Sequence, residues 1–142
     1  MDISKLDVIG ASNNGVDIKI LNPLDNEPMG LEITVVGAMS TNYQDDLSIL
    51  FAEIEDYKEE NKLPENPTKK QLAQNKILVD KFDAEITAKF LAKYTKGWKG
   101  LIENGKEISF SIDEAERIYK QYPIIRTQVQ RGMMDIANFI KA

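Results

Sequence analysis

Neither cysteine nor histidine occurs among the 142 residues of this chain. Their absence excludes thiol nucleophiles, Ser-His-Asp triads, haem ligation by histidine and the usual zinc sites, because each of these needs one of the two side chains. Disulfide bonds are excluded as well, which fits a reducing compartment. The chemistry that remains belongs to carboxylates and lysines, so the composition does not favour an enzyme.

Long apolar runs are also missing. No stretch approaches the roughly 20 apolar residues of a membrane span, and the polar start Met1–Lys5 is not typical of a signal peptide. We therefore expect a cytoplasmic protein that has no membrane partner. A chain of 142 residues with 42% hydrophobic and 29% charged residues predicts one globular domain that can fold without a disulfide bond or a structural metal.

Basic residues are scarce in the first half of the chain, and the second half has the opposite balance of charge. Residues 1–66 carry 14 acidic and only 4 basic side chains, whereas residues 67–142 carry 9 acidic and 14 basic ones. The overall net charge of −5 argues against nucleic acid as a partner, because affinity for phosphates depends on Lys and Arg. Two interpretations stay open: the halves attract each other within one fold or between subunits, or the acidic half faces a basic partner.

An arm and a hairpin open the chain. Residues 1–15 end in the turn-rich Ala11–Gly15, and we expect a flexible N-terminal arm there. The segments Val16–Ile20 and Leu31–Val35 alternate apolar and polar residues, which predicts two half-buried strands around a proline-bounded turn. The result is a β-hairpin over residues 16–36. Because an isolated hairpin is only marginally stable, its apolar face must pack on helices.

Helical periodicity dominates residues 40–142. We expect one helix over 41–57, a longer one over about 68–94, and two further helices near the C-terminus. The sequence Glu103–Lys106 is typical of a tight turn and predicts a second small hairpin. The predicted fold is therefore α+β and predominantly α-helical, a single domain over 16–142 whose N-terminal hairpin packs on about four helices.

Several residues near the C-terminal helices predict architecture. Trp98, the only tryptophan, stands in Gly-Trp-Lys-Gly, which predicts a sharp turn filled by a buried indole. Ser-x-x-Glu at Ser111 precedes an apolar-periodic run, as in a capping box. A proline disfavours helix before it but tolerates helix after it, so two helices should meet at Pro123. The residues that we expect to be structural are Trp98, Phe110, Ser111, Glu114, Tyr122 and Pro123.

Three short segments invite a chemical interpretation and have a better structural one. Asp45 and Asp46 are adjacent in a predicted helix, so their side chains diverge by about 100°, and compensation of the helix dipole explains them. Asp25–Glu27 lacks the length and the terminal glutamate of an EF-hand loop. Gly97–Gly100 lacks the spacing of a phosphate-binding loop. We expect no catalytic residue, no cofactor and no metal.

Partner binding is the remaining kind of function, and the predicted helix over 41–57 is our preferred contact. Its acidic back would steer a basic client, while the neighbouring hairpin offers a strand edge for pairing. The acidic residues that we assign to partner binding are Asp46, Glu53, Glu55 and Asp56.

A series of weak motifs runs through nearly the whole chain after residue 15, and their order and spacing are informative together. These motifs are Ile20–Pro23, Pro28–Gly30, Gly37–Ser40 with Tyr43, Gly97–Gly100, Phe110–Ala115, Tyr122–Val129 and Phe139. Through them the chain resembles the small tail assembly chaperones of long-tailed, siphovirus-like bacteriophages.

The resemblance implies a non-enzymatic role in virion assembly. Such proteins are thought to coat the long, aggregation-prone tape-measure protein and to help the tail-tube protein polymerise around it. The expected partners are therefore these two phage proteins, together with self-association, in the cytoplasm of a bacterial host. The alternative is a structural virion component, such as a tail-completion or head-tail joining protein.

Overall fold

In the computed structural model, which describes residues 1–140, the two alternating segments pair as predicted. Strand β1 (Val16–Leu21) runs antiparallel to β2 (Pro28–Val35), with Ile18 opposite Ile33. The period of two places the apolar side chains of both strands on one buried face, while the other face is polar and open to solvent. The predicted N-terminal hairpin is present.

A third strand, β3 (Thr95–Lys99), pairs antiparallel with the free edge of β2 and completes the sheet in the order β1-β2-β3. Trp98 is half-buried and lies in this strand opposite Ile33, so the prediction of a turn at Trp98 is wrong. The chain turns two residues later, at Gly100, whose φ is 79°. The segment extends because it pairs with β2, and its own sequence of five residues has no clear period.

The N-terminal residues are more regular than the arm that we expected. A 3₁₀ turn (Ile3–Leu6) and helix α1 (Val8–Asn14) precede β1, and Asp7 caps α1 by accepting a hydrogen bond from the Gly10 N–H. Ser12 is completely buried, and its carbonyl accepts from the Gly37 N–H. The Asn13 side chain also exchanges hydrogen bonds with Thr41. Polar contacts of Ser12 and Asn13 therefore help to hold α1 on the body.

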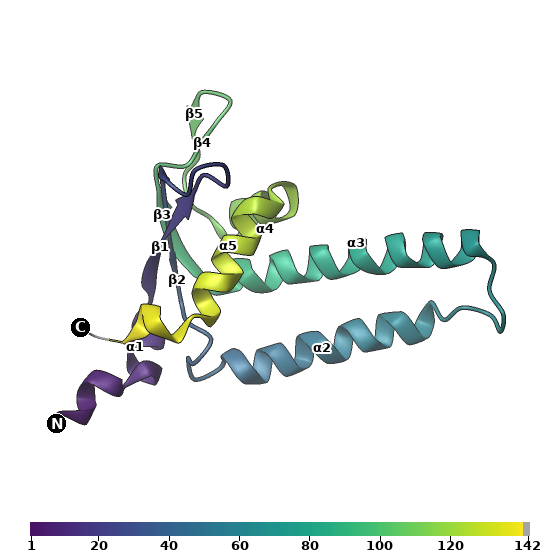
Figure 1. Ribbon diagram of the computed structural model, residues 1–142, viewed down its shortest axis with the longest axis horizontal. Helices are drawn as coiled ribbons and strands as arrows, with labels where there is room; N and C mark the ends of the chain where they lie inside the picture. Colours follow the sequence, from purple (N-terminus) through teal and green to yellow (C-terminus); the bar gives the residue numbers. More distant parts are fainter. Residues whose placement is uncertain (141–142) are drawn as a thin grey trace.

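Two long antiparallel helices form a projection from one end of the sheet (Figure 1). Helix α2 spans Tyr43–Glu60, and α3 spans Lys69–Lys93. Thr68 and Gln71 form a complete capping box at the start of α3. We call this pair the helical hairpin, residues 43–93.

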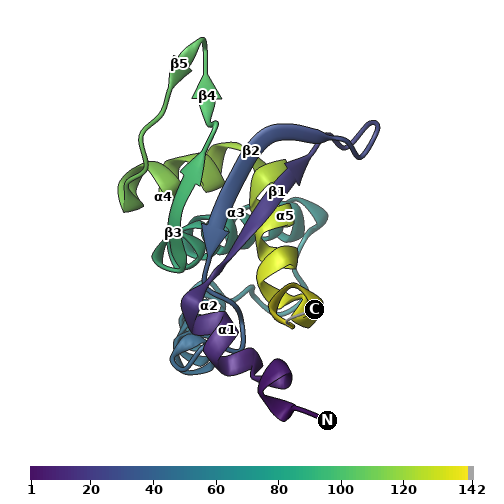
Figure 2. The same cartoon turned by 90° about the vertical axis from the view of Figure 1, so that its left-hand side faces the viewer.

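Helices α4 (Ile112–Gln121) and α5 (Pro123–Met134) meet at the predicted corner, where Tyr122 ends one and Pro123 begins the other. Helix α5 packs against β1 and β2, and α4 packs against the end of α3, as Figure 2 shows from the side of the sheet. The helical spacing of Met133, Ile136 and Ile140 predicts that the last helix continues to about residue 140. It is shorter in the structure: α5 ends at Met134, and a 3₁₀ turn (Ile136–Phe139) follows. The small hairpin is present as β4 (Ile102–Glu103) and β5 (Lys106–Glu107).

The core lies between the buried face of the sheet, the C-terminal end of α3 and the helices α4 and α5. The described part of the chain is mixed α/β and 57% helical, which confirms the predominance of helix. None of the helices described in residues 1–140 is long and apolar enough to cross a lipid bilayer. Completely buried core side chains include Ile33, Val35, Ile118, Tyr119 and Val129.

Candidate partner-binding grooves

The residues that we expected to be structural surround the second half of the core. The Trp98 indole packs edge-on against Phe110, with 5.0 Å between ring centroids, and its N–H donates to the Ile108 carbonyl at 2.7 Å. The Ser111 hydroxyl accepts from the Glu114 N–H at 3.0 Å and so caps α4. The Glu114 side chain does not complete the capping box; it accepts hydrogen bonds from Arg117 instead.

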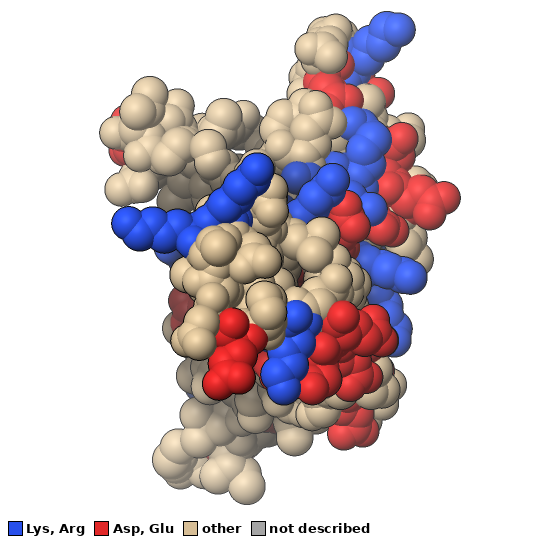
Figure 3. Space-filling view, turned by 90° about the vertical axis from the view of Figure 1, so that its right-hand side faces the viewer, with Lys and Arg blue, Asp and Glu red and all other residues tan. Residues whose placement is uncertain are grey.

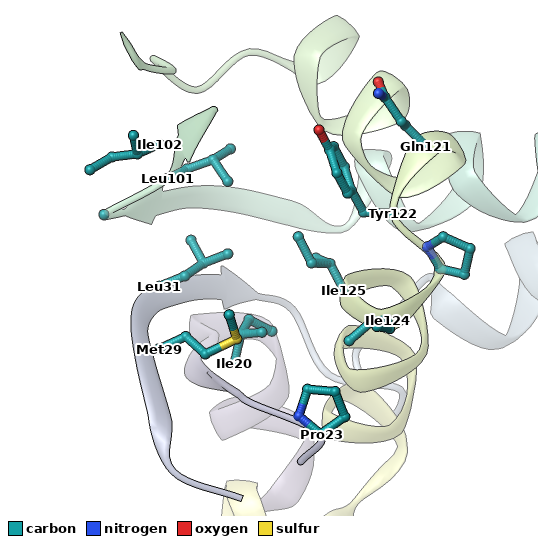
Figure 4. A pocket seen from close by; sticks show the side chains of 12 residues that line it. Ile20, Pro23, Met29, Leu31, Leu101, Ile102, Gln121, Tyr122, Ile124 and Ile125 are labelled. Atoms are coloured by element: carbon teal, nitrogen blue, oxygen red, sulfur yellow. The ribbon is translucent and has the colours of Figure 1, made fainter. Parts of the chain in front are cut away.

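One apolar groove lies beside the α4–α5 corner and has a volume of about 430 Å³. We call it the corner groove. Side chains from three distant parts of the chain turn toward it (Figure 4): from the β1–β2 hairpin, from the segment after β3, and from the corner itself. None of its lining residues is charged. They are Ile20, Pro23, Met29, Leu31, Gly100, Leu101, Ile102, Gln121, Tyr122, Pro123, Ile124 and Ile125.

A close crossing of two glycines builds one wall of the corner groove. Gly30 and Gly100 both have positive φ, at 85° and 79°. A side chain at Gly100 would collide with the backbone oxygen of Gly30. The chain can therefore leave β3 directly over β2 only because Gly100 lacks a Cβ atom, and this crossing brings Leu101 and Ile102 to the groove.

Gln128 of α5 holds the opposite wall. Its side-chain amide accepts from the Leu21 N–H and donates to the Leu21 carbonyl, both at 2.8 Å. The amide thus pairs with the edge of β1 as another strand would, and it satisfies backbone groups that an edge strand leaves open. The groove wall formed by α5 is in this way fixed to the sheet.

A polar network closes the rim next to Tyr122. Glu103 accepts hydrogen bonds from the Arg117 guanidinium and from the Tyr122 hydroxyl. Arg117, and to a smaller degree Tyr122, lower the pKa of Glu103 below its usual range, and Glu103 raises the pKa of Tyr122. Glu103 is therefore ionised at neutral pH. Its carboxylate is held by Arg117 and in turn fixes the Tyr122 hydroxyl at the rim of the groove.

A second groove lies between α2, α3 and the start of α4, with a volume of about 540 Å³. We call it the hairpin groove. Its floor is apolar, with Leu50, Ile86 and Phe90, and two exposed isoleucines, Ile49 and Ile112, line it as well. Unlike the corner groove, it is lined by charges of both signs: Asp46, Glu53, Lys89, Lys93, Asp113 and Glu116.

The four acidic residues assigned to partner binding do not form one cluster. Asp46 and Glu53 line the hairpin groove, whereas Glu55 points to another side of α2 and is bonded to Lys58 at 3.4 Å. Asp46 accepts from Lys93 at 2.9 Å and from the Tyr94 hydroxyl, and these hydrogen bonds lower its pKa. Asp46 therefore fastens α2 to the end of α3. Glu53 and Asp56 remain exposed.

Within residues 1–140, no group of three or more acidic side chains is placed to hold a metal ion. The buried hydroxyl groups of Thr95 and Tyr119 are 2.7 Å apart, and the Thr95 hydroxyl donates to the Leu91 carbonyl. Burial raises the pKa of Tyr119 to about 12, so this phenol stays protonated at neutral pH. The Thr95–Tyr119 pair is therefore suited to core packing and not to catalysis. The two grooves, by contrast, have apolar linings or floors that are suited to binding apolar side chains.

Sequence reasoning missed both grooves as sites. It did single out the segments that form the corner groove, because eight of the twelve lining residues lie in motifs that carry the resemblance to tail assembly chaperones. No signal in the sequence showed that Ile20–Pro23, Gly100 and Tyr122–Ile125 come together, since this depends on the glycine crossing.

Comparison with known proteins gives the family. Residues 39–142 match the model of a family described as YdaY prophage protein. Because the match covers most of the chain, this protein belongs to that family and is phage-derived. The match begins just before α2 and includes both helices of the hairpin and the α4–α5 corner. Neither the curated proteins nor the solved structures gave a match.

Proposed function

We propose that this protein is a tail assembly chaperone, which binds the phage tape-measure protein and assists assembly of the tail tube without catalysing a reaction. The observation that carries the proposal is the corner groove: an uncharged, apolar hollow at the surface of a phage-derived protein, lined mainly by the segments that resemble tail assembly chaperones.

The groove suits a helical client. A long helical protein exposes apolar stripes before its final partner covers them, and an amphipathic helix binds by inserting a few of its apolar side chains into such a groove. A volume of about 430 Å³ lies in the range of roughly 300–1,000 Å³ that is usual for ligand pockets. Met29, Ile102 and Ile124 at the groove are each more than half exposed, so they are available to the client.

Reversibility follows from the absence of charge in the groove. Separating a buried ion pair leaves an unpaired charge, which is costly. Apolar burial contributes roughly 25 cal/mol per Å² and needs no specific partner group, so any equally apolar surface can replace the client. The polymerising tail tube would provide that surface. Exposed acidic residues of α2, such as Glu53, Glu55 and Asp56, would act on the association rate with a basic client, because exposed charge is screened beyond about 8 Å.

Co-expression with the tape-measure protein of the same phage tests the proposal. We expect the wild-type chain to keep the client soluble and to copurify with it. Ile124→Glu should reduce the soluble, bound client at least tenfold, because it places a charge in the groove. The residue is in the first turn of α5, where an acidic side chain is compatible with the helix.

Ile136→Glu is the matched control. Ile136 is about as exposed as Ile124 but lies outside both grooves, so this variant should behave as wild type. If the client is equally soluble without the chain, or if purified virions contain the chain in stoichiometric amounts, the chaperone proposal fails. A structural role in tail completion or head-tail joining would then replace it.

A further inference from the structure

The helical hairpin has very little burial of its own. No residue from Glu55 to Thr87 is buried, although this stretch contains the last third of α2 and most of α3. The Tyr57 and Phe82 rings stack face to face with 3.9 Å between centroids, and they are the main aromatic contact along the distal half. Large apolar side chains remain exposed on sides of the helices that no other element covers.

Two rows of side chains define one face of the hairpin, which is open except near the body, where the start of α4 borders the hairpin groove. On α2, residues 49, 53, 56 and 60 follow one another at helical spacing, and on α3 residues 78, 81, 85 and 89 do so. Both rows belong to the side that bears the hairpin groove, which contains Ile49, Glu53 and Lys89. We call this side the groove face. Its rows are Ile49, Glu53, Asp56 and Glu60 on α2, and Leu78, Lys81, Glu85 and Lys89 on α3.

Each row combines one exposed apolar residue with charge. Ile49 is 58% exposed, and Leu78 is 42% exposed. The α2 row carries three acidic residues, whereas the α3 row has two lysines and one glutamate. In the described part of the chain, none of these six charged side chains forms a salt bridge.

The same division holds for the helices as a whole. Helix α2 has a net charge of −6 and α3 one of +3. Figure 3 looks at the molecule from the free end of the hairpin and shows mainly acidic side chains over its lower part, where α2 lies, and basic side chains over the part above, mixed with acidic ones on the right. A surface divided in this way is complementary to a copy of itself.

We propose that the groove face binds a second copy of this chain, so that two hairpins form a four-helix bundle in a symmetric dimer. Charge selects the arrangement. If α2 lay on the partner's α2, acidic rows would face each other, whereas α2 on the partner's α3 places acidic residues against lysines on both sides of the two-fold axis. In this arrangement Ile49 and Leu78 of each copy are covered.

The size of the groove face is sufficient for a dimer. Helix α2 has 18 residues, which corresponds to a length of about 27 Å, and two adjacent helices are about 20 Å wide. The flat projection is therefore roughly 500 Å² per copy, and surface relief raises the area toward the roughly 800 Å² per partner of a standard interface. This inference does not depend on the chaperone proposal, because the client is proposed to bind in the corner groove, none of whose lining residues belongs to the groove face. Only the exposed acidic residues Glu53 and Asp56 enter both proposals.

Charge reversal in two separate chains provides the test. One variant carries Glu53→Lys, Asp56→Lys and Glu60→Lys, and the other carries Lys81→Glu and Lys89→Glu. In sedimentation equilibrium, wild type should be a dimer at micromolar concentration. Each variant alone should bind itself at least tenfold more weakly, because like charges then face each other. An equimolar mixture should recover the wild-type affinity, since both sets of contacts become attractive in the heterodimer.

An apolar pair of variants places the contact on one face. Ile49→Glu should shift wild-type dimer to monomer, whereas Phe51→Glu should not, because the two residues have almost equal exposure but point about 160° apart around α2. Circular dichroism confirms that each variant is folded. A wild-type chain that is monomeric at 200 µM, a mixture no stronger than its components, or equal effects of Ile49→Glu and Phe51→Glu would overturn the proposal.

Discussion

The body and the helical hairpin of this molecule are built from similar residues but differ in what covers them. In the body, Ile33, Ile118 and Val129 are completely buried between the sheet and helices α4 and α5. In the hairpin, from Glu55 to Thr87, no residue is buried. Because most helical stability in proteins comes from tertiary packing, we expect the long, regular helices of the hairpin to be less stable than the body.

The comparison also separates two kinds of helix start. Thr68 and Gln71 make a complete capping box at the outer end of the hairpin, while Ser111 makes only half of one in the body. Local interactions are therefore best satisfied where tertiary contacts are fewest. We infer that α3 relies on its cap at the free end and on core packing at the other, where Ala88, Phe90, Leu91 and Ala92 are buried.

The largest expected effect comes from removing the same side chain in the two regions. Ile118→Ala should lower the free energy of unfolding by about 2–5 kcal/mol, because it leaves a cavity at a completely buried position. Ile77→Ala should change it by less than about 0.5 kcal/mol, because Ile77 is 68% exposed on the hairpin. Urea unfolding followed by circular dichroism measures both. Equal losses would contradict the division into two regions.

A smaller effect is expected at the glycine crossing. Gly100 and Gly105 both have a φ of 79°, so alanine is strained at either position by about 1–2 kcal/mol. Only at Gly100 would the new methyl group also meet backbone, at Gly30, whereas the space around Gly105 is open. Gly100→Ala should therefore cost about 1–3 kcal/mol more than Gly105→Ala in urea unfolding. If the two variants are equally stable, the crossing does not constrain the corner groove.

Removing the cap of α4 should lower the stability of the whole protein, whereas removing the cap of α3 should have only a local effect. Ser111→Ala should lower global stability by about 0.5–2 kcal/mol, since α4 unfolds with the body. Thr68→Ala should leave global stability nearly unchanged and should accelerate amide hydrogen exchange in the first turns of α3. A global loss of the same size in Thr68→Ala would mean that hairpin and body unfold as one unit.

The smallest effect concerns the root of the hairpin. Hydrogen bonds from Lys93 and Tyr94 lower the pKa of Asp46 in the folded protein. Their contribution to stability is therefore complete above the unfolded pKa of about 4 and is lost as the pH falls through the lower, folded pKa. Asp46→Asn should be slightly less stable than wild type at pH 7, and the difference should shrink as the pH falls below about 4. Urea midpoints at pH 7, 5, 4 and 3 measure this; a difference that stays constant over this range would exclude the ionised contact.

Much of the secondary structure could be predicted because its signals are local. Alternation identified β1 and β2, Ser-x-x-Glu identified the start of α4, and Pro123 identified the corner. The turn Asn104–Gly105 predicted the small hairpin, and both residues have positive φ in the structure.

The features that could not be predicted depend on distant parts of the chain. Strand β3 is extended because the edge of β2 receives it, and its sequence alone favours a turn. Helix α1 is held by hydrogen bonds of Ser12 to Gly37 and of Asn13 to Thr41, and such polar contacts leave no apolar pattern in the sequence. The corner groove needs three segments separated by up to about a hundred residues, and the openness of the hairpin becomes visible only when the other helices are placed.

Native-state hydrogen exchange at low protein concentration tests the central claim that the body is stable by itself while the hairpin awaits a partner. Amides of β2 and α4 should exchange only through global unfolding. Amides between Glu55 and Leu78, including those of the capped start of α3, should exchange with opening free energies at least about 2 kcal/mol lower, and raising the protein concentration should slow them selectively. Uniform protection of hairpin and body at low concentration would contradict the account.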